Sequence, residues 1–462
     1  MKTDHSNTLH ELVTTGIMTG NSLDAVDVAT FRTRVVGDRV SQFEQIAFHS
    51  SPCVQELRDA VFELKAQFKQ SKGLVTPKIS PLLDRTSMLY HKDVNAAVTA
   101  ARAALRSEQG MEIDLIGFHG QTVGHAPPSV TTSGQIPYTI QLVTGSAIAD
   151  LQNVVTVSDF RSDDLLNGGE GAPFAPGFNA LLTPALGVQT AAFINAGNTS
   201  NIALIDTCTN QVRGWDCGPC NQFPDLLMRE EQGAAVDTDG AIALTGAVAP
   251  QWIRKLWDSA VLREDGSNAL EIRGPRSFDP QWYRLPAELQ DRAESFADRM
   301  RTVIAFSAYC VTHSLAIAAT EDFQPEKVLL FGGGWKNPAL LAELKNLVSG
   351  RASYILPEHA QLFANLSRAT PAVDGVIRNS DDLGLPSNGM EAGIFAFAAI
   401  QRILNQPFTQ PSFTNCKSPT RCGTVHTPAS GAVSSKLVPF NLKDESMLFK
   451  DKRLGRAAPA NR

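Results

Sequence analysis

A short glycine-bearing turn near the N-terminus, Gly16 to Asp24 (GIMTGNSLD), is the first candidate site. Glycine between two strands allows backbone N–H groups to approach a phosphate closely. The turn adds side-chain donors from Thr19, Asn21 and Ser22. Asp24 or Asp27 could hold Mg²⁺ through water. An ordinary Asn/Gly hairpin turn is the alternative, and the lack of a Walker A pattern disfavours a P-loop enzyme.

Two further turns have a composition that suits a nucleotide. Asn195 to Asn201 (NAGNTSN) is small and polar and lies between two strand-like segments, as a second phosphate-binding turn would. Gly332, Gly333 and Gly334 follow a strand-like segment, and Pro338 suits the first position of a helix. These glycines would let an adenine or a ribose lie against the backbone. Each turn taken alone is also common in ordinary loops.

The segment Gly214 to Asn221 (GWDCGPCN) allows two interpretations. Cys217 and Cys220 form a Cys-Gly-Pro-Cys sequence, which in thioredoxin-like proteins is a redox motif at a helix N-terminus. Alternatively, Asp216 on a rigid Gly/Pro-rich loop could accept a proton from a nucleophile. The redox interpretation expects the segment near the start of a compact βαβ domain, whereas it lies in the middle of this chain.

Polar residues also follow two expected strands. Ser158 to Arg161, with the glycine-rich Asn167 to Pro173 behind it, fits a hinge or the rim of a polar-ligand site, or simply a local Asp–Arg pair. His119 and Gln121, at another strand end, could face a sugar. A lone histidine at such a place is more often structural.

Hydrophobic periodicity gives the elements that must position these residues. Strands are expected at 25–31, 115–118, 139–142, 154–157, 191–194, 200–205 and 327–331. Helices are expected at 53–68, 91–105, 297–320, 338–348 and 388–404. The two strand–turn–strand units lie about 180 residues apart. This arrangement is what a two-lobed nucleotide clamp requires.

Composition excludes several classes of protein. The chain has 462 residues, 43% hydrophobic and 19% charged, with a formal net charge of −6. No dense Lys/Arg run supports nucleic-acid binding, and we recognise no membrane-spanning segment of about 20 apolar residues. The polar N-terminus lacks the apolar core of a signal peptide, and the seven cysteines are expected to be mostly free thiols. These two observations together indicate a cytoplasmic protein. We expect residues 1–11 to be a disordered leader and residues 406–462 a largely disordered tail.

Taken in order, the motifs of this chain resemble those of the anhydro-N-acetylmuramic acid kinase family, to which levoglucosan kinases are related. The matching stretches are Gly16 to Asp27, Phe118 to Thr122, Asp159 to Pro173, Asn195 to Asn201, Trp215 to Asn221, Asp237 to Gly240, Gly332 to Asn337, and Met390 to Ala392. The resemblance implies an actin-like ATPase fold of the α/β class, with two lobes around a nucleotide cleft. Lobe I would comprise residues 12–155 and 388–405, and lobe II residues 156–387.

The resemblance also implies an activity. ATP would phosphorylate O6 of a small sugar while water opens its 1,6-anhydro bond, a reaction of peptidoglycan recycling, with Asp216 as the base for that water. The expected ATP-binding residues are Gly16, Thr19, Gly20, Asn21, Ser22, Leu23, Asp24, Asp27, Asn195, Gly197, Asn201, Gly332, Gly333, Gly334 and Asn337. Arg161 and Glu391, together with His119 and Gln121, would contact the sugar, and Asp24 and Asp27 would hold Mg²⁺. The expected partner is the sugar alone, and a homodimer is a possible assembly.

The chain departs from the family pattern at several positions. It has Asn21, Ala25, Glu170, Asn198, Cys217 and Cys220 where the family pattern carries Thr, Gly, Gln, Gly, Thr and a small residue. The family's T-G-R-E segment is reduced to Gly274-Pro275-Arg276-Ser277. Three alternatives therefore stay open: a levoglucosan kinase, a nucleotide-binding sensor or pseudokinase, and a thiol redox protein.

Overall fold

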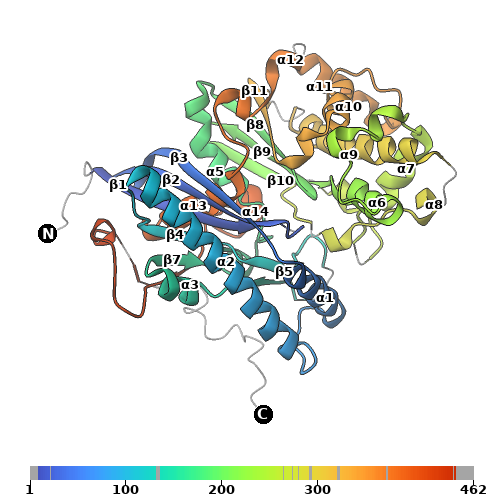
Figure 1. Ribbon diagram of the computed structural model, residues 1–462. Helices are drawn as coiled ribbons and strands as arrows, with labels where there is room; N and C mark the ends of the chain where they lie inside the picture. The colour runs from blue at the N-terminus through green and yellow to red at the C-terminus, as the bar shows by residue number, and fades with distance from the viewer. Residues whose placement is uncertain are drawn as a thin grey trace.

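The computed structural model describes residues 9–443 except 21, 132–135, 264, 273, 279, 291–293, 320–322, 371–372 and 441. It contains two large β-sheets with helices packed around them (Figure 1). The first sheet has the strand order β13-β7-β4-β1-β2-β3. Its strands are β1 (Leu9–Thr19), β2 (Ala25–Val36), β3 (Arg39–Pro52), β4 (Leu115–Phe118), β7 (Val155–Ser158) and β13 (Thr424–His426).

The second sheet has the order β10-β9-β8-β11-β12. Its strands are β8 (Thr190–Ala196), β9 (Thr199–Asp206), β10 (Gln211–Pro219), β11 (Lys327–Phe331) and β12 (Ile377–Asn379). A separate hairpin of β5 (Gln121–Ala126) and β6 (Tyr138–Leu142) completes the described strands.

The two large sheets repeat one topology. In the first, β1 pairs antiparallel with β2 and parallel with β4, β2 pairs antiparallel with β3, and β4 pairs parallel with β7. In the second, β8, β9, β10, β11 and β12 take the same five places with the same directions. A duplicated five-strand sheet of this order is the actin-like arrangement, so the predicted fold class is confirmed.

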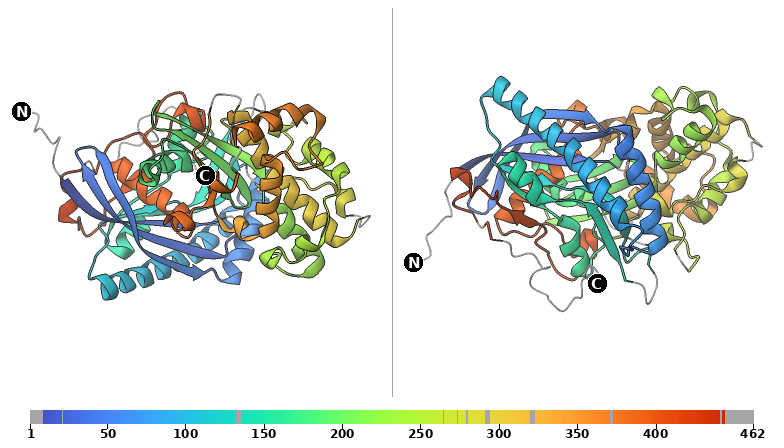
Figure 2. Two further views of the ribbon diagram at one scale, coloured as in Figure 1. Left: turned by 90° about the horizontal axis from the view of Figure 1, so that it is seen from above. Right: turned by 60° about the horizontal axis from the view of Figure 1, so that its bottom comes forward.

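The helices form the outer layers and one central element. They are α1 (Gln55–Ser71), α2 (Ser80–Gln109), α3 (Gly145–Gln152), α4 (Phe160–Leu166), α5 (Ala175–Leu182), α6 (Gln222–Gln232), α7 (Pro250–Ser259), α8 (Ala287–Gln290), α9 (Phe296–Ala319), α10 (Pro338–Val348), α11 (Ala360–Ala369), α12 (Val373–Val376), α13 (Met390–Ile403) and α14 (Pro411–Thr414). Figure 2 shows α1 and α2 along one side of the first sheet, and the helices of the second sheet at the opposite end of the molecule.

Helix α13 joins the two halves. It is buried along most of its length and packs on β1, β2 and β4 of the first sheet and on α5. Gly16 of β1 and Gly117 of β4 make this approach possible. A Cβ atom on Gly16 would lie 1.8 Å from the carbonyl oxygen of Ala392, and one on Gly117 would lie 2.0 Å from that of Phe395. Both glycines therefore serve strand–helix packing.

The expectation of a disordered tail from residue 406 is wrong as far as Lys443. Strand β13 extends the first sheet by pairing with β7, and Phe408 and Phe413 are buried. Gly423 is held from two sides, because its carbonyl accepts from Arg402 Nε at 2.7 Å and its N–H donates to Asp163 Oδ2 at 3.0 Å. The Ser/Thr/Pro-rich composition suggested disorder, but a few buried side chains and hydrogen bonds are enough to fix this segment on the first sheet. Residues 444–462 lie outside the described part.

The predicted boundaries need two further corrections. Strand β1 begins at Leu9, so residues 9–11, predicted as part of a disordered leader, belong to the first sheet, while residues 1–8 lie outside the described part. Strand β7, which ends at Ser158, belongs to the first sheet, so the chain crosses to the second half only after this residue.

One helix of the described part is long and apolar enough to cross a membrane, contrary to what we expected from the sequence. Helix α9 has an 18-residue stretch with a mean hydropathy of 1.6, but 89% of that stretch is buried inside the protein. It is the core helix of the second half, with α10 and α11 against it.

Candidate functional site

A cleft of about 930 Å³ lies where the hairpin turns of the two sheets meet. The β1–β2 turn and the β8–β9 turn both line it, as does the glycine run after β11. The N-terminal end of α13 contributes Glu391. The duplicated topology thus brings together segments that are far apart in the sequence.

In the β1–β2 turn, the chain reverses tightly, with the Leu23 N–H donating to the Gly20 carbonyl at 3.1 Å. Thr19, Gly20, Ser22, Asp24 and Asp27 line the cleft. Leu23 does not, because its side chain is fully buried in the core under the first sheet, so its predicted nucleotide contact is wrong for the side chain. Gly16 does not line the cleft either, because it lies within β1 and packs against α13, so its predicted nucleotide contact is wrong. Asn21 lies outside the described residues.

The two candidate metal ligands have different surroundings. Asp27 Oδ1 accepts from Ser50 Oγ at 2.6 Å, and burial, with Asp24 adding to the effect, raises the pKa of Asp27. Asp24 is largely exposed and pairs with Arg58 at 3.3 Å. Within the described residues, no group of three His, Cys, Asp or Glu side chains could hold a metal ion by itself.

The glycine run after β11 packs against the β8–β9 turn. A Cβ atom on Gly332 would lie 2.3 Å from Asn195 Oδ1, and one on Gly334 would lie 2.7 Å from Asn221 Oδ1. Gly333 also lines the cleft, and a Cβ atom on it would meet nothing within 4 Å. Asn337 lines the cleft too, but its Oδ1 caps α10 by accepting from Ala339 N at 2.9 Å.

Asp216 lies inside β10, at a bulge in its pairing with β9, and not on a Gly/Pro-rich loop as the sequence suggested. Its Oδ2 accepts two hydrogen bonds, from Phe278 N at 2.6 Å and from Ser277 Oγ at 3.1 Å. Burial raises the pKa of Asp216 to about 6, although these two bonds and the positive charge of Arg161 act in the opposite direction. Its Oδ1 makes no hydrogen bond to the described residues, and the side chain lines the cleft.

Arg276 holds the segment that carries Ser277 and Phe278. It is fully buried and donates to the Asp216 carbonyl at 2.9 Å and to the Leu270 carbonyl at 2.8 Å, as well as to Ile272. The Arg276 carbonyl accepts from Asp216 N at 3.0 Å. The residues from Arg276 to Phe278 therefore position Asp216.

Three of the residues expected at the sugar are held by hydrogen bonds: Arg161 and His119 bind each other, and Glu391 binds Asn195, which we expected at the nucleotide. Arg161 Nε donates to His119 Nε2 at 2.8 Å, and its guanidinium lies 5.1 Å above the ring of Phe174. Burial and the Arg161 charge keep the pKa of His119 well below its usual value, so this ring is a neutral acceptor. Asn195 Nδ2 donates to Glu391 Oε1 at 3.1 Å, which links β8 to α13. Burial raises the pKa of Glu391.

Of the predicted site residues in the described part, the following line the cleft: Thr19, Gly20, Ser22, Asp24, Asp27, His119, Arg161, Asn195, Gly197, Asn201, Asp216, Gly332, Gly333, Gly334, Asn337 and Glu391. Gln121 does not. It is fully buried and its amide donates to the Thr122 carbonyl at 3.2 Å, so its predicted sugar contact is wrong.

Sequence reasoning missed several residues of the cleft. Ser277 and Phe278 hold Asp216, and their only signal was their place beside Arg276. Asp225 and Asp237 also line the cleft. Asp237 accepts from the N–H groups of Ile242 and Ala243, both at 3.0 Å, and burial raises the pKa of Asp225 to about 6. Asp237 belongs to one of the stretches that resemble the family pattern, Asp237 to Gly240, whereas nothing in the sequence around Asp225 suggested a site.

The thiol interpretation is contradicted. Cys217 and Cys220 are buried, and Cys217 lies inside β10. Burial raises the pKa of Cys217 to about 12 and that of Cys220 even further. A reactive thiol needs the opposite setting, an exposed group with a lowered pKa.

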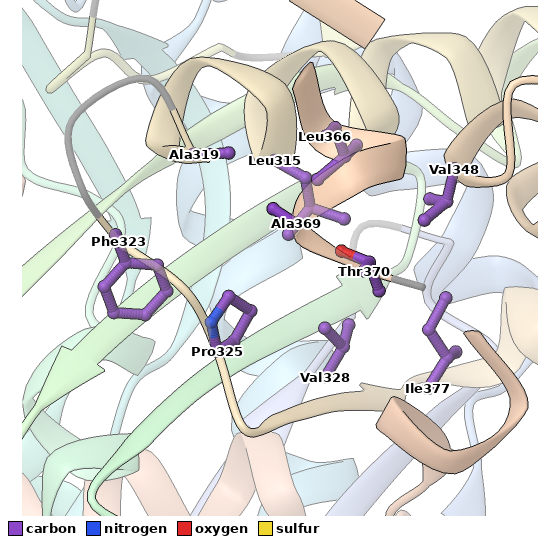
Figure 3. Close-up of a pocket in the computed structure, with 10 residues that line it drawn as sticks. All are labelled: Leu315, Ala319, Phe323, Pro325, Val328, Val348, Leu366, Ala369, Thr370 and Ile377. Atoms are coloured by element: carbon purple, nitrogen blue, oxygen red, sulfur yellow. The ribbon is translucent and has the colours of Figure 1, made fainter. Parts of the chain in front are cut away.

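A second hollow, in the helical layer of the second half, is too small for a ligand. It holds about 10 Å³ and is lined almost entirely by apolar side chains, including Leu315, Phe323 and Ile377 (Figure 3). This is at most the space of one water molecule, without the polar partners that a water requires.

Comparisons with known proteins point to one family. Residues 12–354 match the family model "Anhydro-N-acetylmuramic acid kinase". A protein of that name from Methylorubrum populi is 29% identical over 424 residues, covering 89% of this chain and 98% of the relative. Another, from Legionella pneumophila strain Lens, is 31% identical over 316 residues, covering 68% of this chain and 75% of the relative.

Similar solved structures are more distant. The ROK family glucokinase from Streptomyces griseus, in complex with glucose and AMPPNP, has a TM-score of 0.30 and 12% identity, covering 78% of this chain and all of that one. The activator of 2-hydroxyisocaproyl-CoA dehydratase from Clostridium difficile, with bound ADPNP, has a TM-score of 0.36 and 11% identity, covering 84% of this chain and 95% of that one.

Proposed function

This chain belongs to the anhydro-N-acetylmuramic acid kinase family and is a sugar kinase, and we propose that its substrate is anhydro-N-acetylmuramic acid. In the proposed reaction, water attacks C1 and the bond between C1 and the bridging O6 breaks. The released O6 takes up the phosphoryl group of ATP. The main support for this proposal is the geometry of Asp216. Two hydrogen bonds hold its Oδ2, and the side chain lines the cleft, so Oδ1 is available to a bound water.

Asp216 is the base for the attacking water. With a pKa of about 6, it is about 90% ionised at pH 7 and a stronger base than an ordinary aspartate. The backbone N–H of Phe278 and the hydroxyl of Ser277 restrict its rotation. The water's proton passes to Oδ1, and the oxygen forms the new hydroxyl on C1.

The sugar end of the cleft carries a fixed positive charge. Arg161 and Lys336 are the two Lys or Arg residues among the described residues that line the cleft, and Lys336 belongs to the glycine run after β11. We therefore assign the lactyl carboxylate of the sugar to the Arg161 side. Glu391 would accept hydrogen bonds from sugar hydroxyl groups, whereas the neutral His119, whose Nε2 already accepts from Arg161, would hold that guanidinium in place.

The residues of the hairpin turns fit ATP and Mg²⁺. Open space at Gly333 suits the base, and Gly20, Ser22 and the Asn195 to Asn201 turn offer donors for phosphates. Bound ATP supplies the phosphoryl group, and Mg²⁺ neutralises its charge. Asp27, at the cleft, would hold Mg²⁺ through water, as this ion prefers. Asp24 would act at longer range from the rim.

Two further expectations remain proposals. A cytoplasmic location fits a recycling enzyme that uses ATP. A homodimer is the assembly we propose to test, by light scattering after size-exclusion chromatography.

The decisive experiment measures ATP consumption with anhydro-N-acetylmuramic acid, with levoglucosan and with the same two sugars after hydrolysis of the 1,6-anhydro bond. The products are identified by mass spectrometry. Run in oxygen-18 water, the proposed reaction places the label on C1 of the product and none on the phosphate. A clear preference for levoglucosan would overturn the proposed substrate and keep the kinase class. ATP binding without turnover of any sugar would favour the sensor or pseudokinase.

A further inference from the structure

A buried carboxyl group outside the cleft is joined to Asp216 through two serines. Glu170, between α4 and α5, is 2% exposed, and its Oε2 accepts from the backbone N–H of Ser129 at 3.1 Å. Ser129 Oγ donates to the Ser277 carbonyl at 2.8 Å. Ser277 Oγ in turn donates to Asp216 Oδ2 at 3.1 Å. One continuous chain of contacts therefore connects the two acids.

The loop around Glu170 is itself fixed. The Glu170 N–H donates to the Thr414 carbonyl at 2.6 Å. The next residue, Gly171, donates to Asp164 Oδ2 at 2.7 Å and accepts from Arg161 Nη1 at 2.6 Å. A rigid loop thus places Glu170 between the Arg161 side and the Asp216 side of the site.

The charge of Glu170 changes in the pH range in which the enzyme would work. Its pKa is raised to about 7, mainly by burial and to a smaller extent by the charges of Asp164 on α4 and Asp216 on β10, while the hydrogen bonds from Ser129 act in the opposite direction. His125 on β5 faces the same region as a neutral ring, because burial and Arg161 lower its pKa to about 3. Arg161 is the nearby cation, at the Gly171 carbonyl.

We propose that Glu170 is a positioning residue for Asp216: it fixes Ser129, and through Ser129 the Ser277 segment that holds Asp216 Oδ2. Its negative charge also strengthens Asp216 as a base once Glu170 is ionised. Glu170 does not belong to the cleft lining, so it acts through these neighbours and not on the substrate. This inference rests on the proposed function.

Two substitutions separate position from charge. Glu170→Gln keeps the length and an acceptor for Ser129 but loses the charge. We expect its kcat to match the wild type within about twofold at pH 6, where Glu170 is protonated, and to fall about tenfold behind at pH 8. Ser129→Ala breaks the link to Ser277, so its kcat should fall by a similar factor at both pH values. The KM for the sugar should stay within about twofold in each.

Glu343→Gln is the matched control, because Glu343 is also buried, paired with Arg301 and Tyr354 in the helical layer of the second half. It should lower the melting temperature without changing the pH dependence of kcat. If Glu170→Gln follows the wild type at pH 8, or if Glu343→Gln produces the same pH-dependent loss, the proposal is wrong.

Thermal unfolding tests the link without any substrate. A raised carboxyl pKa means that ionisation costs the folded state stability as pH rises from the unfolded value of 4.5 to about 7. The melting temperature of Glu170→Gln minus that of the wild type should therefore grow from pH 5 to pH 7 and then level off. In the Asp216→Asn background this growth should be smaller, and equal growth in both backgrounds would overturn the coupling. If the wild type turns over no anhydro sugar but this growth and its dependence on Asp216 are seen, the proposed function fails and the link stands.

Discussion

At the residue scale, the character of the site is set by how Asp216 is held. Two donors on one carboxylate oxygen would by themselves lower its pKa, but removal from water has the larger effect, and the result is about 6. The carboxylate is therefore mostly ionised at neutral pH and still basic enough to take a proton. A strand bulge supplies the rigidity that we had attributed to a loop.

Asp216→Asn keeps the shape of this side chain but cannot take a proton from water. We expect kcat to fall by about 10²–10⁴, with ATP affinity unchanged. Steady-state assays with calorimetry of ATP binding would measure both. Asp206→Asn is the control, because Asp206 is partly exposed at the end of β9, and its Oδ1 accepts from the N–H groups of Cys208 and Thr209 in the turn that follows. Full activity in Asp216→Asn would remove Asp216 from the reaction.

The cysteines make a separate prediction at this scale. Cys208 is exposed and the other six are buried. A thiol reagent applied to the native protein should therefore label Cys208 quickly and the rest only on unfolding, and Cys208→Ser should abolish the fast phase. Activity should not depend on reductant. Rapid labelling of Cys217 or Cys220 in the native state would revive the redox alternative.

At the element scale, helix α13 is central because it contacts the strands of the first sheet at backbone distance. Gly16→Ala would force a Cβ into the Ala392 carbonyl, which nothing nearby can accommodate without moving the helix. We expect a loss of stability of about 1–3 kcal/mol or more, seen as a lower denaturation midpoint.

Gly333→Ala is the matched control for this glycine. The added methyl group meets no atom within 4 Å and Gly333 lines the cleft, so we expect unchanged stability and, if the nucleotide lies here as proposed, a lower ATP affinity. If Gly16→Ala has wild-type stability but weak ATP binding, the original assignment of Gly16 to the nucleotide would be right after all.

The segment after α13 is the second feature at the element scale. Ending the chain after Gln406 removes β13, two buried phenylalanines and the partners of Arg402 and Asp163. Losing one buried phenylalanine side chain costs about 3–5 kcal/mol, while a domain is stable by only about 5–15 kcal/mol. We expect the shortened protein to be largely unfolded or insoluble by circular dichroism.

A second truncation, after Lys443, keeps every described contact of this segment and serves as the control. It should have the melting temperature of the full chain. Equal stability of the two truncated proteins would show that β13 is dispensable, as the composition had suggested.

At the scale of the whole molecule, the cleft follows from the repetition of one sheet topology. The β1–β2 turn of the first half and the β8–β9 turn of the second half both line the cleft. Helix α13 and the Asn195–Glu391 hydrogen bond hold the two halves together at this point. Residues nearly 200 positions apart in the sequence therefore line one cleft. Neither half contains the complete site.

The sequence by itself determined the fold class and most of the cleft. Strands β8, β9 and β11 and helix α10 were predicted closely, because buried strands and capped helices leave strong local patterns. The glycine turns were found because close backbone approach requires glycine at particular places, and Asp216 was preferred over the neighbouring cysteines because of the family resemblance. Sixteen of the predicted residues line the cleft.

Only the tertiary structure decided the rest. It showed that Gly16 serves packing, that Leu23 and Gln121 are buried away from the cleft, and that β13 extends the first sheet. It also joined Glu170 to Asp216 through Ser129 and Ser277. These relations depend on contacts between segments far apart in the chain. Local composition and spacing do not predict these contacts, because burial and hydrogen bonding depend on what packs against a residue and not on its neighbours in sequence.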